Sequence, residues 1–147
     1  MRPHDIAILL KISCKKNRTW FMKDLSNELG ISAGEVSESI NRAVFSGLIS
    51  SDKKTLKKIS IIEFLKYGIQ YVFPVQPGSF VRGIETAHSA RPLKDKIISE
   101  DIYVWPYAKG HVKGLSIKPL YPNIPQACLK DNKFYEIISL VDVIRVG

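Results

Sequence analysis

The sequence contains few of the residues on which several common functional classes depend. Its two cysteines, Cys14 and Cys128, stand far apart in 147 residues, which excludes a disulfide-rich scaffold and zinc-ligand spacing. It has three histidines, and it shows no Gly-rich phosphate loop, His/Cys metal cluster or nucleophile elbow. We therefore expect no enzyme activity, no catalytic residue, no metal site and no cofactor.

Long apolar runs are also lacking. No stretch is long enough to span a membrane as a helix, and no signal peptide precedes the first expected helix. Together with the low cysteine content, these absences predict a protein of the reducing cytoplasm without membrane contact. The chain is long enough to bury a sizeable core in one domain or in two small ones.

Basic residues outnumber acidic ones. The chain has 22 Lys and Arg against 14 Asp and Glu, which gives a formal net charge of +8. Residues 1–73 hold 12 of the basic residues and 7 of the acidic ones, so the excess is tilted toward the N-terminal half. Such a charge suits polyanionic partners, although DNA, RNA and acidic proteins would all be attracted by it.

The most informative stretch covers residues 25–49. Leu25 and Leu29 share one helical face, and Gly30 follows where a helix commonly ends in a left-handed residue. Ser32 and Glu35 form a Ser-x-x-Glu capping box that starts a second helix. The inward positions of that helix repeat every four residues at Val36, Ile40 and Val44. Two helices joined by a Gly-containing turn are typical of a DNA-reading helix-turn-helix.

The outer face of the second helix supplies the candidate DNA-reading residues, which are Ser32, Ala33, Gly34, Ser37, Glu38, Asn41 and Arg42. Small residues at its start permit close approach to DNA, and Asn41 and Arg42 have the donors to contact base edges or phosphates. Glu38 has two readings. It either accepts a hydrogen bond from cytosine or pairs with Arg42 four positions later.

A basic segment follows this helix. Turn residues between short apolar stretches predict a β-hairpin over residues 50–59, here called the lysine hairpin. Its lysines, Lys53, Lys54, Lys57 and Lys58, either hold DNA phosphates or only solvate the hairpin. The loop of residues 15–18 offers Arg18 as a further backbone contact, with a solvated connector as the alternative.

Residues from about 3 to 72 resemble the winged helix-turn-helix of MarR-like transcription regulators of bacteria and archaea. The resemblance rests on Leu25, Leu29, Gly30, Ile31, Ser32, Val36, Ser37, Ile40, Asn41, Arg42, Gly47, Leu48 and Ile49. It implies three helices, a β-hairpin wing and a linking helix. It also implies a homodimer that reads a palindromic operator in the major groove of double-stranded DNA. Glu38 departs from the pattern, because such helices often carry a basic residue there.

The second half, residues 74–147, is rich in proline and is expected to contain short strands and a final helix. The predicted fold class is therefore α+β, with a DNA-binding domain over residues 1–73 and a dimerisation, effector or partner-binding region after it. Asp131 is placed to cap the final helix. Its apolar positions, Phe134, Ile137, Ile138, Val141 and Ile144, either form a dimer interface or pack against residues 74–127.

One loop in this half is a candidate ligand site. Arg82, His88 and Arg91 have the charges to hold an anionic effector, or they satisfy backbone carbonyls. The leading functional prediction is a sequence-specific DNA-binding regulator of transcription. The alternative is a non-enzymatic protein-interaction or antitoxin-like accessory module that binds protein, or nucleic acid without sequence preference.

Overall fold

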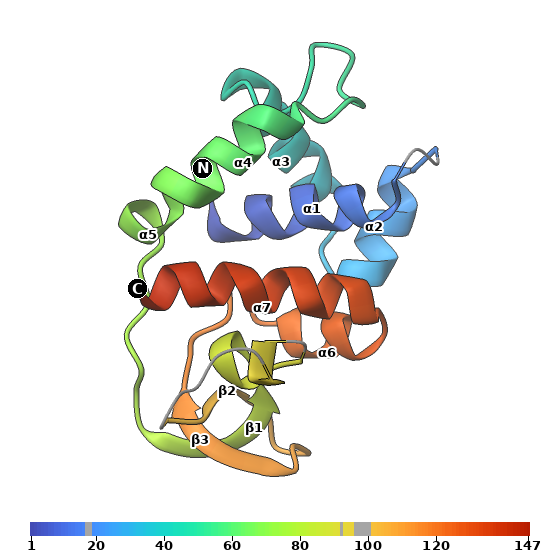
Figure 1. Ribbon diagram of the computed structural model, residues 1–147. Helices are drawn as coiled ribbons and strands as arrows, with labels where there is room; N and C mark the ends of the chain where they lie inside the picture. The colour runs from blue at the N-terminus through green and yellow to red at the C-terminus, as the bar shows by residue number, and fades with distance from the viewer. Residues whose placement is uncertain (17–18, 92, 96–100) are drawn as a thin grey trace.

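The computed structural model describes residues 1–16, 19–91, 93–95 and 101–147 and has a mixed α+β fold, as predicted (Figure 1). The elements, in chain order, are α1 (Pro3–Cys14), α2 (Met22–Leu29), α3 (Ala33–Phe45), α4 (Lys58–Tyr67), α5 (Ile69–Val72), β1 (Phe80–Glu85), η1 (Ala87–Ser89), η2 (Leu93–Asp95), β2 (Tyr103–Pro106), β3 (Val112–Ser116), α6 (Ile124–Leu129) and α7 (Asn132–Val146). Within the described residues, no helix is long and apolar enough to cross a membrane.

Helices α1 and α7 lie side by side across the middle of the molecule (Figure 1). Helices α2, α3 and α4 lie on the α1 side, and the strands lie beyond α7 (Figure 1). Every residue of α1 from Asp5 to Ile12 is buried, as expected for a helix covered on several faces. One apolar cluster joins Leu9 and Ile40 to Phe134 and Ile138. The core therefore continues across the predicted boundary at residue 73.

The turn between α2 and α3 follows the sequence signals. Gly30 ends α2 with a φ of 67°, a left-handed conformation that glycine adopts at little cost. Ser32 caps α3 by accepting a hydrogen bond from the Glu35 amide at 3.2 Å. The lysine hairpin is short. It forms no regular strands: its two arms are joined by an isolated bridge between Ile49 and Leu56 and by a hydrogen bond from the Ser50 amide to the Thr55 carbonyl.

The helix after the hairpin begins at Lys58, inside the range predicted for the hairpin, and no side chain caps it. It also breaks at Gly68, so that α4 ends at Tyr67 and α5 forms a separate turn. Ile62, Leu65 and Ile69 keep a helical spacing through this break, because Gly68 lowers helix propensity without changing the apolar period.

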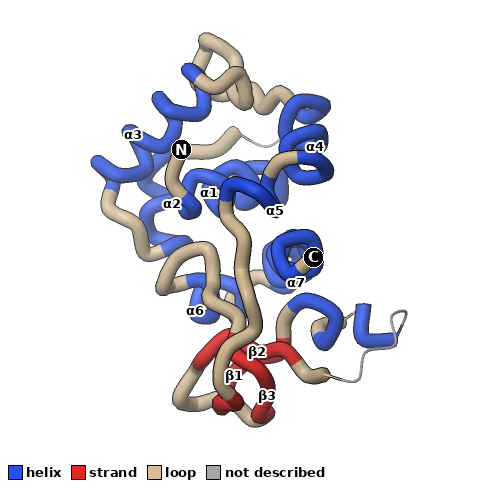
Figure 2. Tube along the Cα trace, turned by 90° about the vertical axis from the view of Figure 1, so that its left-hand side faces the viewer, coloured by secondary structure: helices blue, strands red, loops and turns tan. Residues whose placement is uncertain are grey.

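The three strands close on one another at the end of the molecule opposite α3 (Figure 2). Strand β1 pairs antiparallel with both β2 and β3, which pair with each other in parallel. Gly83 allows this closure, because a Cβ there would clash with the carbonyl of Trp105. Helix α6 was not predicted. Pro125 lies in its first turn, where the missing amide proton has no cost.

The apolar positions of the last helix pack within the chain, which was the predicted alternative to a dimer interface. Asp131 caps α7 as expected, and Phe134, Ile138 and Val141 are buried. Ile137 and Ile144 are partly buried and pack against the same core. Helix α7 contacts α1, α4, α5, α6 and η1, so most of its apolar side chains pack within the chain, while Leu140 stays 46% exposed.

Candidate nucleic-acid interface

The outer face of α3 is open to solvent. Ser32, Ala33, Gly34, Glu38 and Asn41 are exposed, and Ser37 is half-buried. This is the arrangement predicted for six of the seven DNA-reading candidates. Their contact with DNA stays a prediction, but each of them is accessible.

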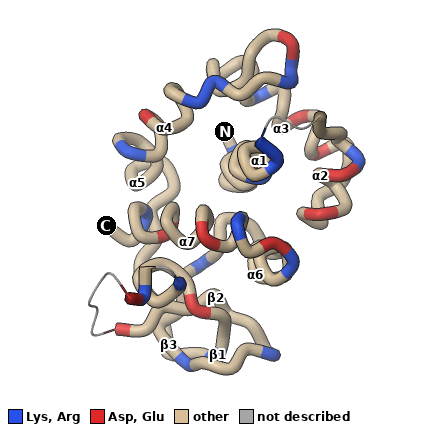
Figure 3. Tube along the Cα trace, turned by 45° about the vertical axis from the view of Figure 1, so that its right-hand side comes forward, with Lys and Arg blue, Asp and Glu red and all other residues tan. Residues whose placement is uncertain are grey.

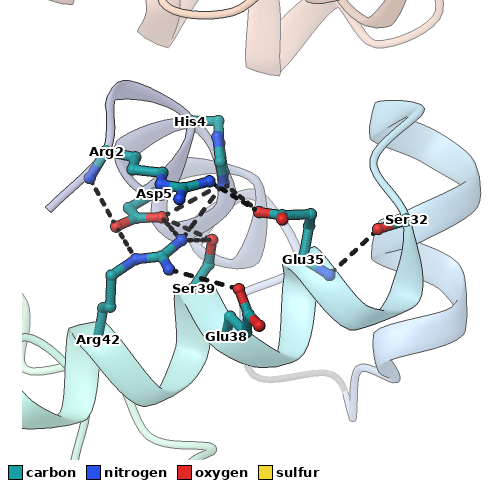
Figure 4. A network of polar contacts seen from close by, with 8 residues as sticks. All are labelled: Arg2, His4, Asp5, Ser32, Glu35, Glu38, Ser39 and Arg42. Atoms are coloured by element: carbon teal, nitrogen blue, oxygen red, sulfur yellow. Dashed lines mark hydrogen bonds and ion pairs between the residues drawn. The ribbon is translucent and has the colours of Figure 1, made fainter.

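Arg42, the seventh candidate, turns back toward α1 (Figure 4). Its Nε donates to Asp5 Oδ2 at 2.8 Å, and its Nη2 donates to Asp5 Oδ1 at 2.9 Å. The same Nη2 donates to Ser39 Oγ at 3.1 Å, and Ser39 Oγ donates to Asp5 Oδ1 at 2.6 Å. Two parallel charge-assisted bonds fix the guanidinium plane. The structure therefore brings Arg42 to a buried carboxylate and does not extend it from the outer face.

The electrostatics of this pair agree with a tight ion pair. Burial by itself would raise the pKa of Asp5, but hydrogen bonds from Arg42, Ser39 and the Arg2 amide outweigh it and lower that pKa below 3.8. The hydrogen bond with Asp5 likewise raises the pKa of Arg42. Both groups are therefore charged in the folded protein near neutral pH.

Acidic side chains surround the start of α3. Glu38 Oε2 lies 3.9 Å from Arg42 Nη1, so the predicted pairing four residues apart is confirmed. The Glu35 carboxylate lies 3.5 Å from Arg2 and 3.6 Å from His4 rather than over the helix end (Figure 4). Only the serine half of the predicted capping box is therefore used at this helix start.

All four lysines of the lysine hairpin are exposed. The nearby carboxylate of Asp52 is directed into the turn, where it accepts hydrogen bonds from the Lys54 amide at 2.8 Å, the Thr55 amide at 2.9 Å and Thr55 Oγ1 at 2.7 Å. These bonds lower the pKa of Asp52. Figure 3 shows the basic positions on this loop and at the start of α4. The hairpin therefore carries a local excess of positive charge.

A hollow of about 380 Å³ separates the hairpin from the end of α1 and is called the hairpin hollow. Among the residues that the structure describes, three lysines and no carboxylate line it: Lys16 comes from the turn after α1, and Lys54 and Lys58 come from the hairpin. Trp20 forms part of the wall and is 7% exposed. Its Nε1 donates to the Lys54 carbonyl at 3.2 Å, and the Lys54 ammonium lies 5.5 Å from its ring centroid. This tryptophan ties the hairpin to the core.

Sequence reasoning missed parts of this surface. Arg18 lies outside the described residues, so its predicted contact cannot be placed. Lys16 belongs to the same basic loop and does line the hollow, although its convergence with Lys54 depends on packing that no motif reveals. Asp5 was missed because an acid in the first turn of a helix is an ordinary feature.

The three anion-site candidates of the C-terminal half do not converge. Arg82 Nη1 donates to the Gly110 carbonyl at 3.3 Å, as the carbonyl-satisfying alternative expected. The His88 ring packs 5.5 Å from the Tyr103 ring, and its Nδ1 has no hydrogen-bond partner among the described residues. Arg91 is exposed and lines a separate hollow with Glu85 and Lys94.

Comparisons with known proteins do not assign the chain to a family. A scan against family models, a search of curated proteins and a search of solved structures returned no significant match. The winged-helix resemblance therefore rests on the motif residues of α2 and α3 and on the features described above.

Proposed function

We propose that the chain binds double-stranded DNA as a winged-helix regulator of transcription. In this proposal the lysine hairpin binds phosphates, and the exposed face of α3 enters the major groove. The observation that carries it is the hairpin hollow, where lysines from segments far apart in sequence converge and no described carboxylate lies in the lining.

The charge distribution supports phosphate binding at this edge. Lys53 and Lys57 are exposed next to Lys54 and Lys58, which line the hollow. The one acidic residue of the hairpin, Asp52, accepts hydrogen bonds within its own turn. Each phosphate neutralised by a lysine releases counterions, which makes binding weaken steeply with salt. A cluster of this kind therefore favours a polyanion over a single small anion.

Helix α3 would supply the base contacts. Exposed Ala33 and Gly34 leave room for the backbone to approach DNA, and exposed Asn41 presents an amide that suits the edge of adenine. Arg42 acts in this proposal as a positioning residue, because its guanidinium is held by Asp5. In this proposal Asn41 contacts the bases in place of Arg42, and Ser37 lies on the same face of the helix.

A second candidate function is supported by the same helix. Its outer face carries exposed Glu38, and Phe45 at its end is 95% exposed. A carboxylate repels phosphate, and an exposed aromatic residue is a common anchor of protein interfaces. Under this alternative, α3 binds a protein partner and the lysine hairpin binds nucleic acid without sequence preference.

The deciding experiment is selection from a randomised duplex pool at two salt concentrations, followed by binding titrations. We expect an enriched sequence, and Asn41→Ala should cost about 1–3 kcal/mol at one base position. The double variant Lys53→Ala/Lys57→Ala should weaken all duplexes alike and reduce the log–log salt slope by about two.

Lys109→Ala is the matched control, because Lys109 is exposed between β2 and β3, at the opposite end of the molecule. It should leave the salt slope unchanged. Salt-sensitive binding without an enriched sequence would favour the alternative function. No binding to any duplex would overturn both nucleic-acid proposals.

A further inference from the structure

A cleft of about 470 Å³ lies where α1 and α2 meet the turn between α6 and α7, and it is called the α1–α7 cleft. Four lysines line it. Lys11 and Lys15 come from α1, Lys130 comes from the end of α6, and Lys133 comes from the first turn of α7. Figure 3 shows basic positions at the end of α1 and beside α6. The cleft therefore gathers positive charge from both halves of the chain.

The two carboxylates of the described lining, Glu28 and Asp131, are already paired. Lys11 Nζ lies 2.5 Å from Asp131 Oδ2 and 3.5 Å from Glu28 Oε2. Lys15 Nζ donates to the two carboxylate oxygens of Glu28 at 2.8 and 2.9 Å. The side chain of Lys11 is 7% exposed and that of Lys15 is 20% exposed. These ion pairs therefore form the inner wall of the cleft.

The other two lysines of the cleft are available to a ligand. Lys130 and Lys133 are exposed, and neither forms an ion pair with an acidic residue in the described part of the chain. With four lysines against two carboxylates, the described lining has an excess of two positive charges. The N-terminus of α7 adds a partial positive charge, because its N-cap Asp131 lies in the cleft. Exposed Thr19 offers a hydroxyl group at the same place.

We propose that the α1–α7 cleft binds the phosphate group of a small molecule, a phosphate monoester or a diphosphate, with Lys130 and Lys133 as its charged partners. A phosphate monoester carries close to two negative charges at neutral pH, which matches the excess positive charge of the lining. Lysine ammonium groups and helix N-termini are common binding partners of phosphate. The volume of the cleft also falls within the range of small-molecule sites, about 300–1,000 Å³.

A small ligand suits this cleft better than a polynucleotide strand. Glu28 and Asp131 would repel the phosphates on either side of the one bound by a strand that crosses the cleft. A single phosphate group can instead contact Lys130 and Lys133 while both acidic residues stay in their ion pairs. No residue of the lysine hairpin is part of the described lining, so the proposal does not depend on the proposed DNA binding.

Cys14 provides a reporter inside the cleft. It lines the cleft and is half-buried, whereas the second cysteine, Cys128, is 2% exposed. Burial and the Asp131 carboxylate raise the pKa of the Cys14 thiol, while Lys133 acts in the opposite direction. A phosphate group bound at Lys133 would cover the thiol and oppose the effect of this lysine, so it should slow the reaction of Cys14.

Two measurements on the full chain test the proposal, with inorganic pyrophosphate as the probe. Calorimetric titration should show saturable binding, and pyrophosphate should slow the modification of Cys14 by uncharged N-ethylmaleimide more than sodium chloride of equal ionic strength does. The double variant Lys130→Ala/Lys133→Ala should raise the dissociation constant at least about tenfold and abolish the protection of Cys14. Lys109→Ala/Lys113→Ala removes the same charge from exposed positions outside the cleft and should change neither result.

Four outcomes would overturn the proposal. They are the absence of saturable binding, binding that Lys130→Ala/Lys133→Ala leaves intact, and protection of Cys14 that sodium chloride matches. The fourth is protection by duplex DNA but not by pyrophosphate, which would make the cleft part of a nucleic-acid surface. Binding that is lost in Lys54→Ala/Lys58→Ala instead would also contradict it, because it would place the anion in the hairpin hollow. Failure of the chain to bind DNA would leave these results unaffected.

Discussion

The guanidinium of Arg42 on α3 and the carboxylate of Asp5 on α1 form two parallel hydrogen bonds, at 2.8 and 2.9 Å. The side chain of Asp5 is 2% exposed and that of Arg42 is 27% exposed. The pair therefore lies at the edge of the core and fixes α3 against α1. Any surface that α3 presents to a partner depends on this contact for its orientation.

Arg42→Ala should destabilise the protein by about 2–4 kcal/mol, because it leaves a buried carboxylate without its charged partner. Urea unfolding measures this loss. Asn41→Ala, a change at the exposed neighbour, should stay within about 0.5 kcal/mol of wild type. An Arg42→Ala protein of full stability with relaxed base preference would instead assign Arg42 to DNA reading.

The same pair predicts a pH dependence of stability. The pKa of Asp5 is lower in the folded protein than the ordinary value of 3.8, so the ionised carboxylate stabilises the native state at pH values above 3.8. This contribution is lost as the pH falls through the pKa of the folded state. The unfolding free energies of wild type and Asp5→Asn should therefore differ most near neutral pH and converge in acid. In an Arg42→Ala background this convergence should largely disappear. A wild-type difference that is constant with pH would contradict the ion pair.

A second buried carboxylate, Asp142, joins α7 to the strands. It accepts hydrogen bonds from Thr86 Oγ1 at 2.8 Å, Trp105 Nε1 at 2.7 Å and Arg145 Nη1 at 2.9 Å. Complete burial raises its pKa, although Arg145 and these donors act in the opposite direction.

Asp142→Ala should therefore cost about 3–5 kcal/mol, since it leaves the buried guanidinium of Arg145 without its carboxylate. Thermal or urea unfolding measures the change. Glu136→Ala, on the same helix but half-buried, should cost less than about 1 kcal/mol. Equal losses of unfolding free energy in the two variants would show that the hydrogen-bond network of Asp142 contributes no particular stability.

Alanine substitutions at two glycines of the α2–α3 region should change the stability of the protein in opposite directions. At Gly30, with φ of 67°, a Cβ would lie 2.6 Å from Asn123 Nδ2, so Gly30→Ala should destabilise by about 1–2 kcal/mol. Gly34 lies within α3 and a Cβ there meets nothing within 4 Å, so Gly34→Ala should stabilise by up to about 1 kcal/mol. Calorimetric melting compares them. If α3 enters the major groove, Gly34→Ala should also weaken DNA binding.

The two cysteines should differ in reactivity. Burial raises the pKa of both thiols, and more strongly for Cys128, which is 2% exposed. A disulfide reagent at mildly alkaline pH should therefore modify Cys14 slowly and Cys128 only after unfolding. Cys14→Ser should abolish the native reaction. Rapid native modification of Cys128 would show that the α6–α7 region opens readily.

Local signals in the sequence predicted local structure well. The Gly30 turn, the Ser32 cap and the Asp131 cap follow from backbone preferences and hydrogen bonds between residues close in the chain. Short strands were expected in the second half of the chain, and β1, β2 and β3 lie there. The break at Gly68 and helix α6 were missed, since each involves a residue whose effect depends on its surroundings.

The sequence by itself determined the α+β class, the helix pair with its turn, and the concentration of lysine after α3, because composition and short-range spacing carry that information. Only the tertiary structure decided which distant residues each side chain meets. It paired Arg42 with Asp5 across 37 residues, brought Lys16 and Lys54 to one hollow, and packed most apolar side chains of α7 within the chain. These outcomes depend on packing between distant segments, where desolvation and charge pairing are settled by the neighbours of a residue in space.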